Sequence, residues 1–137
     1  PVILKGITSV SYAEKAIELG IDGIVVSNHG GRTLDSMPAS IEILPKIAKA
    51  VNGKIPILFD GGIKRGTDVI KAIALGASAV MIGRPIMYGL ATAGALGVAH
   101  TLKILKEELE VSMIFTGCKS IKEMKNLDIF NNNYQFC

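Results

Sequence analysis

Four short runs of apolar residues recur along the chain, and each is continuously hydrophobic instead of alternating with polar positions. The runs cover residues 2–4, 23–26, 55–59 and 79–82. Continuous apolar runs of this length are typical of parallel β-strands that are covered on both faces. The pattern therefore predicts four buried parallel strands.

The segments between the runs carry apolar residues at helical spacing, with signals for where each helix begins and ends. Ser11 and Glu14 predict a capping box for the first helix, which Gly20 is expected to end. Pro38 predicts the first turn of a second helix, and Thr67 predicts the N-cap of a third. We therefore expect strands and helices to alternate along the chain.

A longer helical stretch follows the fourth run, over residues 86–111. The glycines within it, Gly89, Gly94 and Gly97, predict a break or a close packing contact. The charged residues of its second half are expected to form a face exposed to solvent. They are Lys103, Lys106, Glu107, Glu108 and Glu110.

An internal repeat supports this division. Residues 19–26 resemble residues 75–82, and residues 1–6 resemble residues 56–61, so the chain reads as two copies of a (βα)₂ unit. Parallel strands joined by right-handed helical connections leave two main architectures. One is a small doubly wound sheet. The other is half of an eight-stranded barrel, whose complete form takes about 250 residues.

Composition narrows the class of protein further. The 137 residues are 49% apolar, and 15 basic against 12 acidic residues leave a net charge of +3. The charges are interspersed, so no nucleic-acid partner is predicted, and no apolar stretch is long enough for a membrane span. Cys118 and Cys137 lack metal-ligand spacing, so we expect free thiols, no metal site and a cytoplasmic location. The chain does not end in a peroxisomal tripeptide.

The residues with chemical potential all follow the apolar runs. Lys5 follows the first run, Ser27 to Arg32 the second, Asp60 to Gly66 the third, and Gly83 and Arg84 the fourth. In either α/β architecture, ligands bind at this end of the strands. Paired glycines after a strand, followed by a helix N-terminus, favour the binding of a phosphate. We therefore expect the third and fourth loops to hold a phosphorylated cofactor.

His29 and Arg32 lie three residues apart in one glycine-containing loop. A neutral imidazole can take up a proton, and a guanidinium group can hold a carboxylate through two parallel hydrogen bonds. His29 is therefore a candidate general base, and Arg32 is a candidate clamp for a substrate carboxylate.

Three of these loops together resemble the motifs of a known family. Residues 27–35 (SNHGGRTLD), 60–68 (DGGIKRGTD) and 82–85 (IGRP) are similar, in this order, to motifs of the FMN-dependent 2-hydroxy-acid oxidases and dehydrogenases. Glycolate oxidase, lactate oxidase and mandelate dehydrogenase belong to that family. The resemblance extends over residues 1–125, and residues 126–137 are expected to form a C-terminal tail.

The resemblance implies a (β/α)₈ barrel of which this chain supplies strands five to eight. It implies FMN as cofactor, His29 as the catalytic base and Arg32 as the substrate clamp. Lys5 and Ser27 would contact the flavin. The ribityl chain and phosphate of the FMN would be held by Asp60, Gly61, Gly62, Ile63, Lys64, Gly83 and Arg84.

The implied reaction is the oxidation of an (S)-2-hydroxy acid to a 2-oxo acid, with electrons passing to FMN and then to oxygen or another acceptor. Residues 127–131 resemble the C-terminus of bacterial lactate oxidases, which favours lactate over glycolate. One departure from the family is Lys64, where arginine is usual. The difference matters because lysine cannot form the two parallel hydrogen bonds that arginine forms.

The resemblance also leaves the first four strands of the barrel to a partner. We expect either a missing N-terminal half-barrel or a homo-oligomer in which two copies pair. The alternative is a non-catalytic half-barrel that binds FMN or another phosphate compound.

Overall fold

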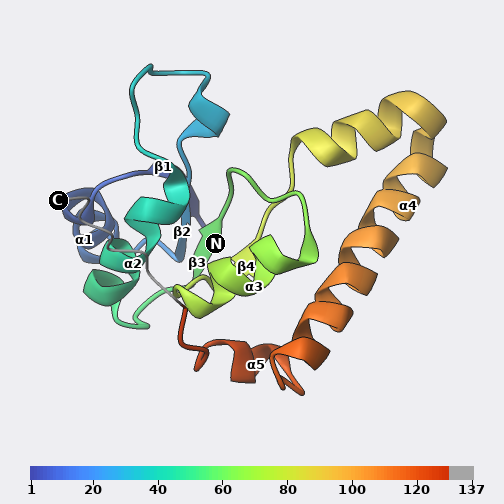
Figure 1. Ribbon diagram of the computed structural model, residues 1–137. Helices are drawn as coiled ribbons and strands as arrows, with labels where there is room; N and C mark the ends of the chain where they lie inside the picture. The colour runs from blue at the N-terminus through green and yellow to red at the C-terminus, as the bar shows by residue number, and fades with distance from the viewer. Residues whose placement is uncertain (130–137) are drawn as a thin grey trace, which may run out of the picture.

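The computed structural model describes residues 1–129 as a single parallel sheet flanked by helices, the longest of which extends away from the sheet (Figure 1). The sheet contains β1 (Ile3–Ile7), β2 (Gly23–Val26), β3 (Ile57–Phe59) and β4 (Ala79–Val80). The helices are α1 (Val10–Glu18), α2 (Ser40–Val51), α3 (Gly66–Ala74), α4 (Arg84–Phe115) and α5 (Ile121–Met124), with a 3₁₀ turn, η1 (His29–Gly31), after β2. The predicted alternation of strand and helix is confirmed.

The order of the strands distinguishes between the two predicted architectures. The strands lie in the order β1-β2-β3-β4, and all neighbours pair in parallel. A doubly wound sheet reverses its strand order at a switch point, and no reversal occurs among these four strands. Because each connection is right-handed by rule, consecutive strands place their helices on the same face. The chain therefore forms half of a (β/α)₈ barrel wall.

The core lies between the sheet and these helices. Ile24 and Val26 of β2 pair in register with Ile57 and Phe59 of β3, and all four side chains are buried on the helix side. The helices contribute apolar residues to the same cluster, among them Ala13, Ala16, Leu44, Ile47, Ile70 and Ile73. The apolar surface that these side chains bury is the main driving force for this half of the fold.

Two predicted helix starts differ from the structure. The cap of α1 is Ser9, whose hydroxyl accepts a hydrogen bond from Tyr12 N at 3.3 Å, and Ser11 is the second residue of the helix. Helix α2 begins at Ser40 instead of Pro38. The reason is tertiary: Ser40 is buried, and its hydroxyl accepts a hydrogen bond from Asn28 N at 3.0 Å.

Helix α3 also begins earlier than predicted. Its first residue is Gly66, and the exposed Thr67 does not cap it. The Asp68 carboxylate instead accepts hydrogen bonds from the backbone N–H groups of Lys64 and Arg65, both at 3.0 Å. Glu108 of α4 adds a third, from Gly66 N at 3.0 Å. Glu108 was expected on a solvent-exposed face and instead caps α3.

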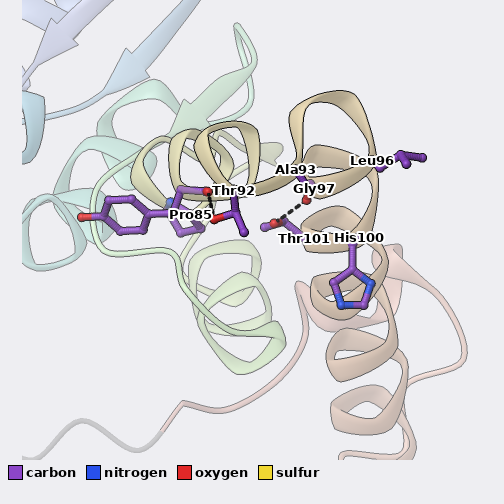
Figure 2. Close-up of a pocket in the computed structure, with 9 residues that line it drawn as sticks. Pro85, Thr92, Ala93, Leu96, Gly97, His100 and Thr101 are labelled. Carbon is purple, nitrogen blue, oxygen red and sulfur yellow. Dashed lines mark hydrogen bonds between the residues drawn. The ribbon is translucent and has the colours of Figure 1, made fainter.

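The predicted break in the last long helix is confirmed. Helix α4 bends at Ala93 and Gly94, whose φ of +55° is left-handed. Figure 2 shows Thr92 and Thr101 facing each other across the bend. Gly89 and Gly97 bring the two segments into close contact, because a Cβ on Gly97 would lie 1.9 Å from Gly89 O.

The end of the described chain packs against the core. Met124 of α5 is fully buried, and Leu127 contacts the same apolar cluster. Cys118 forms no disulfide with any residue in the described range 1–129. Cys137 and part of the predicted tail at 126–137, including the end of the segment that resembles lactate oxidases, lie outside the described residues.

Candidate functional site

A cavity of about 580 Å³ lies where the carboxyl ends of the strands meet. Every predicted site residue except Ser27 lines it: Lys5, His29, Arg32, Asp60, Gly61, Gly62, Ile63, Lys64, Gly83 and Arg84. The prediction that four separate loops deliver these residues to one place is confirmed.

Ser27 lies beneath the cavity and joins two of its residues. Its side chain is buried, and its Oγ accepts hydrogen bonds from Lys5 Nζ at 2.8 Å and from His29 N at 3.1 Å. Lys5 Nζ also forms an ion pair with Asp60. The ends of β1, β2 and β3 are therefore connected through one hydroxyl and one ammonium group.

The loop that carries His29 is held by hydrogen bonds at its base. The amide oxygen of Asn28 accepts a hydrogen bond from Gly30 N at 3.0 Å, and its amide nitrogen donates to Pro38 O at 3.2 Å. His29 has a left-handed backbone, with φ of +55°. Arg32 Nε donates a hydrogen bond to the backbone oxygen of His29 at 3.4 Å, so both residues belong to one turn. Both are exposed at the cavity rim.

The loops after β3 and β4 form the opposite side of the cavity. Ile63 lines it, but its side chain is buried in the core, so it presents its backbone to a ligand. Gly83 is the N-cap of α4, and Arg84 begins the helix. Arg84 reaches back toward the His29 loop, because a Cβ on Gly30 would lie 4.0 Å from Arg84 Nη2. The loops after β3 and β4 and the histidine loop therefore face the same space.

The composition of the cavity fits an anionic ligand that also carries hydroxyl groups. The lining includes four basic side chains, Lys5, Arg32, Lys64 and Arg84, and one carboxylate, Asp60. Asp60 Oδ1 is buried and has no hydrogen-bond partner among the described residues. A buried carboxylate oxygen without a donor is costly, and a ligand hydroxyl would satisfy it. The phosphate and the ribityl hydroxyls of FMN meet both requirements.

Several lining residues were not predicted. Gly30, Met81, Ile82, Pro85 and Tyr88 also border the cavity. Met81 and Ile82 belong to the fourth apolar run, which was assigned to a strand, whereas β4 ends at Val80. Nothing in the apolar run itself indicates that the strand ends two residues early.

A second cavity, also about 580 Å³, lies in the bend of α4. Among the described residues that line it, His100 is the one titratable group besides Tyr88. Figure 2 shows Leu96 pointing away from Thr92 and Thr101. This cavity lacks the basic side chains and the glycine loops of the first, so we assign the functional site to the strand ends.

Comparisons with known proteins agree with this assignment. The family model described as FMN-dependent dehydrogenase matches residues 1–131. A 2-hydroxyacid oxidase of Dictyostelium discoideum is 51% identical over 133 residues, which is 97% of this chain and 34% of the relative. An L-lactate oxidase of Lactobacillus jensenii is 51% identical over 134 residues, or 98% and 33%. The chain thus spans about a third of the length of these curated relatives.

Solved structures give the same result for the fold. A structure of mandelate oxidase superposes with a TM-score of 0.91 at 51% identity, covering 93% of this chain and 39% of that one. A Pediococcus acidilactici protein provisionally described as a lactate oxidase gives a TM-score of 0.95 at 50% identity, covering 98% and 37%. One mandelate oxidase structure contains an FMN adduct.

The order of the strands, the motif residues gathered at their carboxyl ends and the match over residues 1–131 agree with one another. The chain belongs to the FMN-dependent dehydrogenase family.

Proposed function

We propose that this chain forms the FMN-binding half of an (S)-2-hydroxy-acid oxidase. The observation that carries the proposal is the arrangement around Asp60. Asp60 lines a cavity that also contains His29, Arg32 and the glycine loops, and its buried Oδ1 has no hydrogen-bond partner among the described residues. Groups that could bind a phosphorylated polyol, accept a proton and hold a carboxylate thereby lie at one site.

Each side chain has a distinct task in the proposed reaction. Arg32 binds the substrate carboxylate, and His29 takes a proton as the alcohol becomes a carbonyl group. Bound FMN supplies the two-electron acceptor for this oxidation. Lys5 keeps a positive charge at the edge of the cavity, where Ser27 and Asp60 hold its ammonium group.

The glycine loops and basic side chains hold the cofactor. Asp60 would accept a hydrogen bond from a ribityl hydroxyl, and the backbone of Gly61 to Ile63 lies beside it. Lys64 and Arg84, with the N-terminus of α4 at Gly83, would bind the phosphate. Lysine at position 64 presents one point of positive charge instead of a fork, so we expect a contact with less directional preference.

We further propose that the substrate is a small 2-hydroxy acid of the lactate or glycolate class. The relative in Lactobacillus jensenii is an L-lactate oxidase, and the solved neighbours include mandelate oxidase. Oxidation of a panel of L-lactate, glycolate and (S)-mandelate would rank the three acids.

The cavity needs further strands to close, and we propose that a partner half-barrel supplies them. On the edge strand β1, Ile3 and Leu4 are 52% and 42% exposed, which is high for apolar residues of a strand. The partner is either a second copy of the chain or an N-terminal half-barrel. Sizing chromatography at several concentrations separates the two, because a second copy gives a mass that rises with concentration.

We also propose a cytoplasmic location. No helix within residues 1–129 is long and apolar enough to cross a membrane. One relative in Arabidopsis thaliana is named as a peroxisomal (S)-2-hydroxyacid oxidase, so cell fractionation is the appropriate test.

The catalytic proposal is tested by adding FMN to the purified protein and then a hydroxy acid without oxygen. We expect a yellow complex whose visible absorbance bleaches with L-lactate or glycolate. His29→Gln should keep the yellow colour and lose about 100-fold or more in the rate of bleaching, as removal of a general base does. His100→Gln is the matched control, since this histidine lies outside the strand-end cavity. A protein that stays colourless with excess FMN, or a His29→Gln variant that bleaches at the normal rate, would refute the proposal.

A further inference from the structure

Gly6 interrupts strand β1 next to the proposed catalytic histidine. The pairing of β1 with β2 shifts register between Lys5 and Ile7, so Gly6 is an extra residue, a bulge, in the strand. Its φ of +95° lies in the region that favours glycine. Bulges redirect neighbouring side chains, and here Lys5 points toward Ser27 and Asp60.

The space beside Gly6 is filled by the imidazole of His29. A Cβ on Gly6 would lie 2.9 Å from His29 Cε1, 3.7 Å from Nδ1 and 3.8 Å from Nε2. The edge of the imidazole ring therefore occupies the space that a side chain at position 6 would take. A contact of 2.9 Å is closer than a real Cβ tolerates, so either the ring or the strand must move.

The ring is the part that can move. Gly6 lies on a strand, whereas the imidazole is the free end of an exposed side chain. The backbone of His29 is held by the hydrogen bond from its N–H to Ser27 Oγ at 3.1 Å. The imidazole therefore turns about its own side-chain bonds while the loop beneath it stays in place.

We propose that Gly6 is a positioning residue: the missing side chain allows the imidazole of His29 to rest against β1, and this contact sets where the ring lies in the cavity. The catalytic meaning of this contact rests on the proposed function of His29, but the contact itself does not. Ordinary contact begins at 3.4 Å, so we expect Gly6→Ala to displace the ring by about 0.5 Å.

A displacement of this size should be visible both in spectra and in turnover. A misplacement of about 1 Å can cost about 100-fold in rate, so half of that distance predicts about a tenfold loss in kcat. Because substrate binding depends on Arg32 and not on the imidazole, KM should change little.

The experiment compares Gly6→Ala with Gly53→Ala in the full chain loaded with FMN. Gly53 also has a positive φ, +74°, but nothing lies within 4 Å of the Cβ that would be added. It therefore also places alanine at a positive φ, but without the contact. The chain contains two histidines, so the Cε1–H signals of His29 and His100 can be assigned in an NMR spectrum by one substitution.

We expect the His29 signal to move in Gly6→Ala while the His100 signal stays, and we expect both to stay in Gly53→Ala. A folded Gly6→Ala variant whose His29 signal is unchanged would overturn the proposal, whatever its activity. If Gly6→Ala does not fold, the double variant with His29→Ala decides. Recovery of the fold supports a contact with the ring, and continued unfolding assigns the effect to the backbone and overturns the proposal.

The NMR result is independent of catalysis. If the His29 signal moves but His29→Gln bleaches the flavin normally, the contact stands and the proposed role of His29 fails.

Discussion

Ser27→Ala tests the connection between the three strand ends most directly. The hydroxyl accepts one hydrogen bond from a backbone N–H and one from an ammonium group. Net contributions are about 0.5–1.5 kcal/mol for a neutral hydrogen bond and about 1.5–3 kcal/mol for one to a charged group. The lower ends apply here, because Lys5 is 38% exposed and keeps its ion pair with Asp60. We therefore expect a loss of about 2 kcal/mol in the free energy of unfolding.

The matched control is Ser40→Ala. Ser40 is also buried, but its hydroxyl accepts one hydrogen bond, from Asn28 N, and no charged donor. We expect a loss of about 1 kcal/mol for this variant. In urea, with a slope of about 2 kcal/mol/M, the midpoints should fall by about 1 M for Ser27→Ala and by about 0.5 M for Ser40→Ala.

Circular dichroism during the urea titration measures both midpoints. A shift for Ser27→Ala that is no larger than the shift for Ser40→Ala would show that the ammonium group contributes nothing to the connection.

Alanine at Gly66 gains up to about 1 kcal/mol of helix propensity, but its Cβ would lie 2.1 Å from Leu109 N. We therefore expect Gly66→Ala to lower the stability to urea by about 1–3 kcal/mol, and a gain would contradict the packing of α3 on α4. Asp60→Asn should weaken FMN binding about tenfold in a flavin-fluorescence titration, and unchanged affinity would remove Asp60 from the cofactor site. Arg32→Lys should raise KM for the hydroxy acid about tenfold or more, with FMN affinity unchanged.

The sequence predicts where the strands lie and which residues gather at their ends, because both depend on local signals. The predicted burial of all four strands is wrong for β1 and β4, which are largely exposed or half-buried. The apolar runs mark β2 and β3, since strands whose residues are buried or half-buried leave few polar positions. The residues that follow those runs come together because the carboxyl ends of parallel strands share one edge of the sheet. Gly94 likewise marks the bend of α4 through its own backbone preference.

Features that depend on contacts between distant segments were not predictable in this way. Ser40 begins α2 because its hydroxyl accepts a hydrogen bond from the backbone N–H of Asn28, twelve residues earlier in the sequence. Glu108 looks like any exposed helix residue in a charged run, yet it reaches Gly66, 42 residues earlier. The orphaned oxygen of Asp60 becomes apparent when the surrounding side chains are placed.

The carboxylates at the start of α3 limit where the protein can attract an anion. Asp68 and Glu108 already neutralise the positive end of this helix from inside the chain, so a phosphate placed there would meet two negative charges. At the start of α4, no described side chain caps Gly83. The N-terminus of α3 is therefore bound by carboxylates of the chain itself, whereas the N-terminus of α4 is open to an anionic ligand.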